Sequence, residues 1–305
     1  MSTYIYIDHL KTMISKSSQR ALAKAIGINQ GILSSYLNGN YAGDLNKANE
    51  KIKSYIEREA ERGDNWTDVI IQTETLETIN KTIKLIHNMR KIGVIYGPAG
   101  LGKTESAKHY VKKNPGAYLA TARPVYKSVA GVINLLYETI CKEIKNLSPR
   151  HASATLIDRL KGSDAIVVID DAHELTNDAL EEVRAIHDAS QCAFVLIGTE
   201  EILNRLHDRR TGKILAQMSS RIPVRRMFSL EPSRKDLRAV CEAYGVNDKE
   251  VIDRLSSKGK RGGIRLAVHQ VKIARFLSQG KRVDLKHLID AEIVSGEHMI
   301  EASNA

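Results

Sequence analysis

Short apolar runs alternate with longer segments of helical periodicity through the middle of the chain. The apolar runs cover Ile92–Tyr96, Ala117–Ala122, Ala165–Ile169 and Ala193–Ile197. Each has the length of a buried strand, and a long amphipathic segment, about Ser128–Ile144, lies between the second and the third. Alternating strands and helices predict an α/β core built on a parallel sheet.

The first part of the chain has a different pattern, with two short helices predicted within Gln19–Gly39. Ala23 is small enough for two helices to cross closely, and Gly27 tolerates positive φ in the turn. The segment resembles a phage-repressor helix-turn-helix. Its second helix, about Gln30–Asn38, presents polar side chains that suit DNA bases and phosphates, and we select Gln30, Ser34 and Ser35 as candidate DNA contacts. A small helical bundle without a DNA contact is the alternative.

Three domains follow from these patterns. Helical periodicity continues through Asn46–Glu61, and a polar stretch at 61–65 interrupts it. We therefore expect a helix-turn-helix domain at residues 1–64, an α/β core at 65–230 and a basic, helical C-terminal domain at 231–305.

The net charge of +10 over 305 residues is concentrated near the C-terminus. Lysines and arginines exceed acidic residues by 9−7 = +2 in residues 1–64, by 16−17 = −1 in 65–204 and by 21−12 = +9 in 205–305. Clusters such as Arg205/Arg209/Arg210/Lys213, Arg225/Arg226 and Lys258/Lys260/Arg261 are typical of a surface that binds a polyanion. A basic surface that is merely solvated is the alternative reading of the charge.

The composition excludes several classes of protein. The three cysteines are scattered singly, which favours neither a disulfide framework nor a zinc site. The apolar runs are too short to span a membrane, and the first residues lack a secretory pattern. We expect a cytoplasmic protein without a membrane contact.

The first predicted strand leads into a phosphate-binding motif. Its residues are Gly97, Pro98, Ala99, Gly100, Leu101, Gly102, Lys103 and Thr104, and Glu105 continues into the helix that follows. In this pattern backbone N–H groups surround the phosphates of a nucleoside triphosphate, Lys103 neutralises their charge, and the Thr104 hydroxyl binds Mg²⁺. The strand, loop and helix order predicts an ATP site that includes Glu105.

Two adjacent carboxylates end the third apolar run. An extra strand separates this run from the phosphate loop, which marks the additional-strand branch of P-loop ATPases. In that branch the first acidic residue, Asp170, holds Mg²⁺ and the second, Asp171, activates the attacking water. Aspartate is one methylene shorter than the usual glutamate, so Glu174 is the fallback base, and a structural role for Asp171 is the alternative.

Three further residues are candidates for sensing the nucleotide. Thr199 follows the fourth apolar run, where a polar side chain points toward the γ-phosphate. Arg221 lies where an arginine reaches the nucleotide of a neighbouring subunit, although a surface or DNA-contacting arginine is the alternative. Arg265 opens a helix after Gly262–Gly263 and is a candidate to fold back over the phosphates, while we expect this helix to pack through Leu266, Val268 and Val271.

In this order the motifs resemble those of an AAA+ ATPase. Together with the helix-turn-helix and Gln72-Thr73-Glu74-Thr75, they resemble most closely the Mu B family of transposition proteins and the wider IstB- and TnsC-type regulators. The chain departs from the family pattern at Asp171, which puts the rate of hydrolysis in question more than ATP binding.

The resemblance implies an adaptor for target DNA. Such proteins form ATP-dependent helical filaments on duplex DNA without strong sequence preference, and they deliver that DNA to a DDE transposase, which stimulates ATP hydrolysis. By position, the loops that face DNA contain Arg123, Tyr126, Lys127 and Arg150. Two other functions remain open at this point, a replicative helicase loader acting on single strands and a nucleotide-gated transcription regulator reading one operator.

Overall fold

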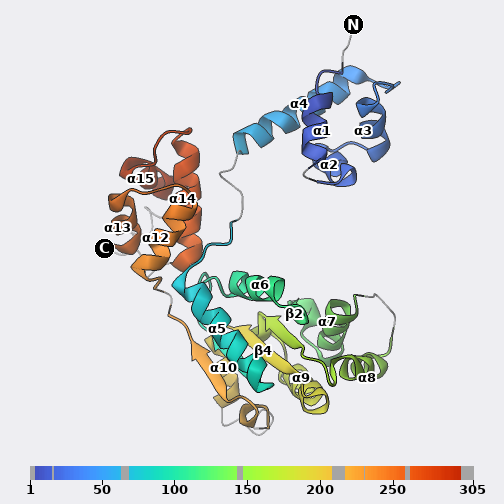
Figure 1. Cartoon of the computed structure of the whole chain (residues 1–305), viewed down its shortest axis with the longest axis vertical. Coiled ribbons are helices and arrows are strands. Elements are labelled where there is room, and N and C mark those ends of the chain that lie inside the picture. Colours follow the sequence, from blue (N-terminus) through green and yellow to red (C-terminus); the bar gives the residue numbers. More distant parts are fainter. Residues whose placement is uncertain are drawn as a thin grey trace. The chain divides into compact units, whose positions relative to one another are not determined.

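The computed structural model describes residues 4–15, 17–62, 69–142, 147–207, 217–229, 231–257 and 262–296. The chain divides into two compact units, Met1–Asp68 and Val69–Ala305, which are described separately (Figure 1). The expected boundary between residues 64 and 65 lies outside the described residues.

The first unit consists of α1 (Ile7–Ile14), α2 (Gln19–Ile26), α3 (Gln30–Leu37) and α4 (Leu45–Arg62). Gly27, with φ 78°, ends α2, and the Asn29 side chain caps α3 by accepting a hydrogen bond from the Gly31 amide. The sequence therefore folds locally into the expected helix, turn and helix. Tyr36 is fully buried and hydrogen-bonds to Asn49. It is therefore a core residue, although the sequence analysis did not select it.

The second unit is built on a parallel sheet with strand order β2-β3-β4-β1-β5. The strands are β1 (Ile92–Tyr96), β2 (Ala117–Thr121), β3 (Ile166–Asp170), β4 (Ala193–Gly198) and β5 (Val224–Met227). The acidic strand β3 is separated from the phosphate-loop strand β1 by β4. The inserted-strand arrangement is therefore present.

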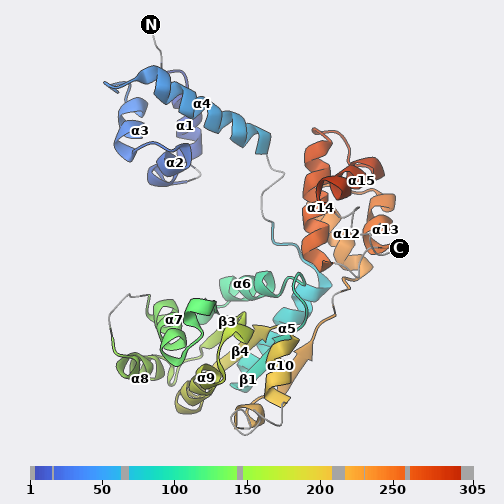
Figure 2. The same ribbon diagram turned by 180° about the vertical axis from the view of Figure 1, so that it is seen from behind.

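Helices cover both faces of this sheet (Figure 2). They are α5 (Glu74–Met89), α6 (Lys103–Lys113), α7 (Val129–Cys141), α8 (Pro149–Leu160), α9 (Asn177–Ser190) and α10 (Glu200–His207). Alternate strand residues point to opposite faces, so Val167 packs with the cluster under α7, α8 and α9, whereas Val168 packs with the cluster under α5 and α6. Helix α7 is shorter than expected because Lys142 is left-handed, with φ 56°, and Ile144 lies outside the described residues.

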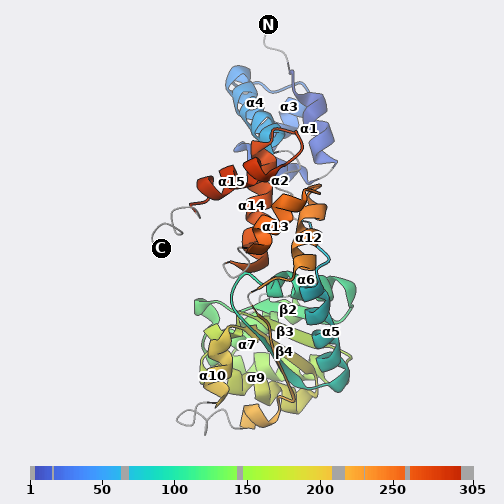
Figure 3. The same cartoon turned by 90° about the vertical axis from the view of Figure 1, so that its left-hand side faces the viewer.

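The C-terminal helices form a bundle with its own core (Figure 3). They are α12 (Arg234–Ala243), α13 (Lys249–Ser257), α14 (Gly263–Leu277) and α15 (Leu285–Val294). Helix α14 buries Ile264, Ala267 and Val271. The expected packing through Leu266 and Val268 is only partly right, since both are half-buried. No helix of the described chain is both long and apolar enough to cross a membrane.

Candidate nucleotide site

The phosphate loop joins β1 to α6 and depends on glycine at three positions. Gly97, Gly100 and Gly102 have φ of 154°, 92° and 81°, a region that side chains disfavour. A Cβ atom on Gly97 would lie 2.4 Å from the carbonyl oxygen of Phe228, and one on Gly100 would lie 2.5 Å from that of Gly262. The loop therefore packs tightly against segments far along the chain, and side chains are excluded at both contacts.

Lys103 is the first residue of α6 and extends back over the loop. Its Nζ donates hydrogen bonds of 2.7 Å to the carbonyl oxygens of Gly97 and Pro98. Burial lowers the pKa of Lys103, while the charges of Asp170 and Asp171 oppose that shift. A partly desolvated ammonium group interacts strongly with anions, which is the property that phosphate binding requires.

Asp170 ends β3 and meets Thr104 from α6. Its carboxylate is 1% exposed, and its Oδ2 has no hydrogen-bond partner among the described residues. Burial raises the pKa of Asp170, and the hydrogen bond with the Thr104 side chain opposes the rise. A buried carboxylate oxygen beside a hydroxyl oxygen is a donor set that suits Mg²⁺, a cation that prefers oxygen ligands. These two residues fit the predicted metal site.

The two candidate bases lie on one turn after β3. Asp171 is exposed and left-handed, with φ 53° and ψ 35°. It precedes the short helix η3 (Ala172–Glu174), whose last residue is the fallback base. The geometry brings both carboxylates to the same turn and leaves the choice between them open.

Arg205 holds this turn in place, a role that the sequence analysis did not predict. Its guanidinium donates a hydrogen bond of 3.1 Å to the carbonyl oxygen of His173 and one of 2.6 Å to Oδ1 of Asn177. Burial lowers the pKa of Arg205. Arg205 thus has a structural partner on this turn, while the predicted polyanion-binding role of its cluster stays a prediction. Six other members of the predicted basic clusters lie outside the described residues: Arg209, Arg210, Lys213, Lys258, Lys260 and Arg261.

Thr199 follows β4 and lies beside the start of the phosphate loop. Gly198 pairs with Tyr96 in the sheet, and the Gly97 amide donates 3.3 Å to the Gly198 carbonyl oxygen. Thr199 is half-buried. This position, one residue beyond a strand adjacent to β1, is compatible with a side chain that senses the nucleotide.

The C-terminal bundle reaches the phosphate loop through the first turn of α14. The backbone N–H of Arg265 donates 3.0 Å to the Gly100 carbonyl oxygen. The side chain is exposed, and its charge contributes to lowering the pKa of Lys103. The backbone contact places the start of α14, which was expected to fold back over the phosphates, against the phosphate loop, while the role of the Arg265 side chain stays a prediction.

Arg221 has a different environment. Its side chain is exposed and donates hydrogen bonds to Asp188 of α9 and to the neighbouring Ser220. Within the described part of the chain it makes no contact with the phosphate loop. Its predicted action on a neighbouring subunit therefore stays a prediction.

Three of the candidate DNA contacts of the core gather in one turn. Arg123 precedes the short helix η2 (Pro124–Tyr126), and its guanidinium lies 5.2 Å from the centre of the Tyr126 ring. Two backbone hydrogen bonds connect this turn to the end of β3 and to the segment that follows it. The Ala122 amide donates a hydrogen bond of 2.8 Å to the Asp170 carbonyl oxygen, and the Thr176 amide donates one of 2.9 Å to the Lys127 carbonyl oxygen.

The remaining DNA candidates are dispersed. Arg150 was expected on a loop, but it lies in the first turn of α8, because Pro149 is well suited to a helix start. It is exposed there. In the first unit Gln30 is exposed, whereas Ser34 and Ser35 are half-buried.

Comparison with known proteins agrees with this geometry. Residues 86–206 match the family described as AAA domain. With its parallel sheet and phosphate loop, the chain has the AAA P-loop ATPase fold. Residues 220–293, which include the start of α14, match the family described as Mu B transposition protein, C terminal.

Curated relatives extend the similarity over most of the chain. The Mu-like prophage FluMu DNA transposition protein B of Haemophilus influenzae is 29% identical over 267 residues, which are 84% of this chain and 91% of the relative. The ATP-dependent target DNA activator B of Escherichia phage Mu is 25% identical over 283 residues, 89% of this chain and 88% of the relative. The activator B of Escherichia phage D108 matches to the same extent. The chain is thus a relative of the Mu B transposition proteins.

Proposed function

We propose that this protein is an ATP-dependent, largely sequence-non-specific duplex DNA-binding protein that forms filaments and delivers target DNA to a DDE transposase. ATP hydrolysis, stimulated by DNA and by the transposase, drives disassembly. Its relatives from phages Mu and D108 are named ATP-dependent target DNA activators.

The observation that carries the proposal is the contact between the Arg265 amide and the Gly100 carbonyl oxygen. It joins the segment that matches the Mu B C-terminal family to the loop that binds ATP. A nucleotide bound in that loop can therefore alter the position of the C-terminal bundle through this contact. An ATP-dependent DNA-binding protein requires such a link between its nucleotide site and the rest of the chain.

The site residues divide the chemical work. Lys103 and the loop amides bind the phosphates, and Thr104 and Asp170 hold Mg²⁺, which neutralises charge on the phosphates. Asp171, with Glu174 as the alternative, orients and deprotonates the attacking water. Thr199 senses the γ-phosphate, Arg265 approaches the phosphates from the bundle, and Arg221 completes the site of a neighbouring protomer.

DNA binding rests on phosphate contacts rather than on base contacts. Arg123 and Lys127 are exposed cations on the η2 turn, with Tyr126 beside them, and Arg150 lies exposed on α8. Cations bind phosphates without reading sequence. Gln30, Ser34 and Ser35 add contacts from the first unit, on a surface too small to specify a long site.

The test is binding to long duplex DNA with ATP, with ADP and without nucleotide, over a range of salt and several unrelated sequences, with electron microscopy of the complexes. We expect ATP-dependent filaments and an affinity that falls steeply with salt and hardly varies with sequence. Lys127→Ala should weaken binding to all sequences alike and lower the salt slope by about one unit for each phosphate that a protomer no longer touches. Lys161→Ala, an exposed lysine after α8, is the matched control.

Two results would favour the other functions. Preference for single-stranded over duplex DNA would indicate a helicase loader. A complex confined to one sequence, resistant to salt and abolished by Gln30→Ala, would indicate an operator-binding regulator.

A further inference from the structure

We infer that Asp188 is a positioning residue for Arg221, fixing its guanidinium so that the free Nη2 group is presented to ATP bound by a second copy of this chain. The inference rests on the proposed function, in which Arg221 acts between protomers. It adds a residue of α9 to the machinery that the sequence motifs define.

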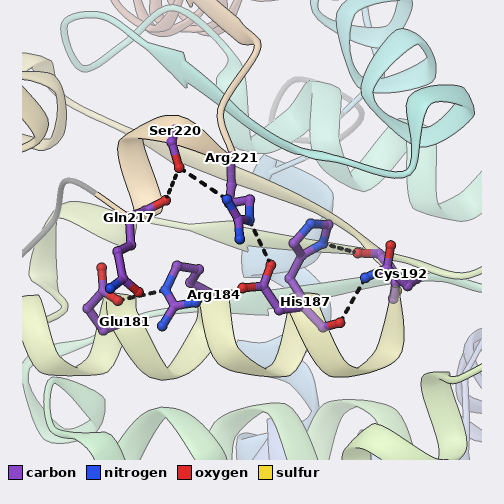
Figure 4. Close-up of polar contacts among 9 residues, drawn as sticks. Glu181, Arg184, His187, Cys192, Gln217, Ser220 and Arg221 are labelled. Atoms are coloured by element: carbon purple, nitrogen blue, oxygen red, sulfur yellow. Dashed lines mark hydrogen bonds and ion pairs between the residues drawn. The ribbon is translucent and has the colours of Figure 1, made fainter.

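Arg221 makes its contacts through two of its three guanidinium nitrogens (Figure 4). Its Nε donates 3.1 Å to Oδ1 of Asp188, and its Nη1 donates 3.2 Å to Oγ of Ser220. Among the described residues, no partner contacts Nη2, and the side chain remains 46% exposed. The Nη2 group is therefore available to an anionic ligand while Nε and Nη1 are held.

Asp188 is itself held by a second arginine. Arg184, one turn earlier on α9, donates 2.6 Å to Oδ2 of Asp188 and 2.7 Å to Oε2 of Glu181. Both oxygens of Asp188 are thus engaged, one by each arginine. Burial alone would raise the pKa of Asp188, but the bonds and charges of Arg221 and Arg184 outweigh it and hold that pKa below its usual range.

The end of α9 that carries Asp188 is anchored in the core. The neighbouring His187 is 2% exposed and hydrogen-bonds at 2.7 Å with the Cys192 carbonyl oxygen just before β4. Ser190 accepts a hydrogen bond of 3.2 Å from the Cys192 amide. The carboxylate therefore projects from a support that is hydrogen-bonded to the core.

A rigid anchor matters because arginine has many rotamers. An arginine that stabilises a phosphoryl-transfer transition state must be within hydrogen-bond reach when charge develops, and a free side chain loses its rotamer freedom at that moment. Holding Nε in advance removes part of this loss, and the planar guanidinium then fixes the direction of its other N–H groups. An ordinary surface ion pair would have no such effect on a neighbouring protomer.

Mixed assemblies separate the two roles. The donor carries Asp171→Asn and Glu174→Gln, so that its own site does not hydrolyse ATP, and it retains Arg221. The acceptor carries Arg221→Ala and keeps an intact site. Mixing them on duplex DNA should restore hydrolysis that neither shows alone, because donor arginines complete acceptor sites.

Asp188→Ala is then added to either partner. In the donor we expect the restored rate to fall about tenfold, through kcat and with the KM for ATP unchanged; in the acceptor it should cause no further loss. Asp188→Asn in the donor retains an oxygen that accepts from Nε, and it should recover part of the rate. Glu181→Gln in the donor, which touches Arg184 and not Arg221, should leave the rate unchanged, and thermal unfolding verifies that each variant is folded.

The outcomes are distinguishable. If the donor that retains Asp188 does not restore hydrolysis, Arg221 does not act between protomers. The role of Asp188 is then overturned with it. Restoration that is insensitive to Asp188→Ala in the donor, or equally sensitive in both partners, overturns the positioning role alone. A faster rate with Asp188→Ala also overturns it, because Asp188 would then restrain Arg221.

Discussion

The Thr75 hydroxyl donates a hydrogen bond of 2.6 Å to Asp236, which lies 161 positions further along the chain. The same carboxylate, 1% exposed, also accepts from the Glu74 amide at 2.6 Å. Asp236 thus links the first turn of α5, on the sheet, to α12 of the C-terminal bundle. The negative charge also lies where a helix N-terminus favours an anion.

Asp236→Ala should lower the free energy of unfolding by about 2–3 kcal/mol, because it leaves the Glu74 amide and the Thr75 hydroxyl without their buried partner. Urea unfolding measures the change. Asp253→Ala is the control, since Asp253 is a half-exposed carboxylate paired with Arg234, and it should cost less than about 1 kcal/mol. Equal losses in the two variants would show that Asp236 is an ordinary surface group.

Lys103→Ala should weaken ATP binding about a hundredfold, the loss expected for one or two charge-assisted hydrogen bonds to phosphate. Titration with a fluorescent ATP analogue measures the affinity. Lys108→Ala removes an exposed lysine further along α6 that pairs with Glu105, and it should leave the affinity unchanged. Similar affinities for the Lys103 variant and the wild type would remove Lys103 from the site.

Asp171→Asn should slow hydrolysis about a hundredfold and leave ATP binding intact, as expected for loss of a general base. Asparagine tolerates the left-handed backbone at this position, so the fold should not change. Phosphate release and ATP affinity are measured for Asp171→Asn and Glu174→Gln side by side. If only the Glu174 variant loses turnover, the base is Glu174.

Gly100→Ala should weaken ATP binding about tenfold, since the new Cβ would lie 2.5 Å from the Gly262 carbonyl oxygen and must displace the start of α14 from the loop. Gly116→Ala has a similar backbone strain, with φ 85°, but its Cβ would lie 3.4 Å from its nearest neighbour and remote from the loop. Comparing the two by ATP titration and thermal unfolding separates the contact from the strain. Equal ATP affinities would show that the contact does not support the nucleotide.

The ion pairs of Asp188 with Arg184 and Arg221 predict that the free energy of unfolding depends on pH. The pKa of Asp188 is lowered in the folded state, so its contribution is present above the unfolded-state pKa and is lost as the pH falls through the folded-state pKa. The difference in urea midpoint between wild type and Asp188→Asn should therefore shrink from pH 7 toward acidic pH. A difference that stays constant would contradict the ion pairs.

The local parts of the fold and the site were predictable from sequence. Buried strands reveal themselves as apolar runs, and the phosphate loop is a contiguous motif whose glycines, lysine and threonine act through their own backbone and side chains. Asp170 was found because it ends such a strand. The expected helix-turn-helix and the inserted strand β2 follow from the same local patterns.

Contacts between distant segments were not predictable. Asp236, Arg205 and Asp188 are ordinary charged residues on amphipathic helices, and only the fold shows that each meets a particular partner. Arg150 was misplaced for a different reason: the local helix start at Pro149 outweighed the loop expected from family resemblance. Thr73, by contrast, carried a local signal: it precedes Glu74 and caps α5 by accepting a hydrogen bond from the Leu76 amide, and threonine is common at helix N-caps.

The two backbone bonds between the η2 turn and the segment after β3 have a thermodynamic consequence. Through Ala122 and Lys127, the turn that carries Arg123 and Tyr126 is hydrogen-bonded to the segment that carries Asp170 and Thr176. When this turn binds DNA, as we propose, any factor by which ATP tightens DNA binding through these bonds must equal the factor by which DNA tightens ATP binding. Long stretches of DNA would then act as a reservoir that retains nucleotide on the protein.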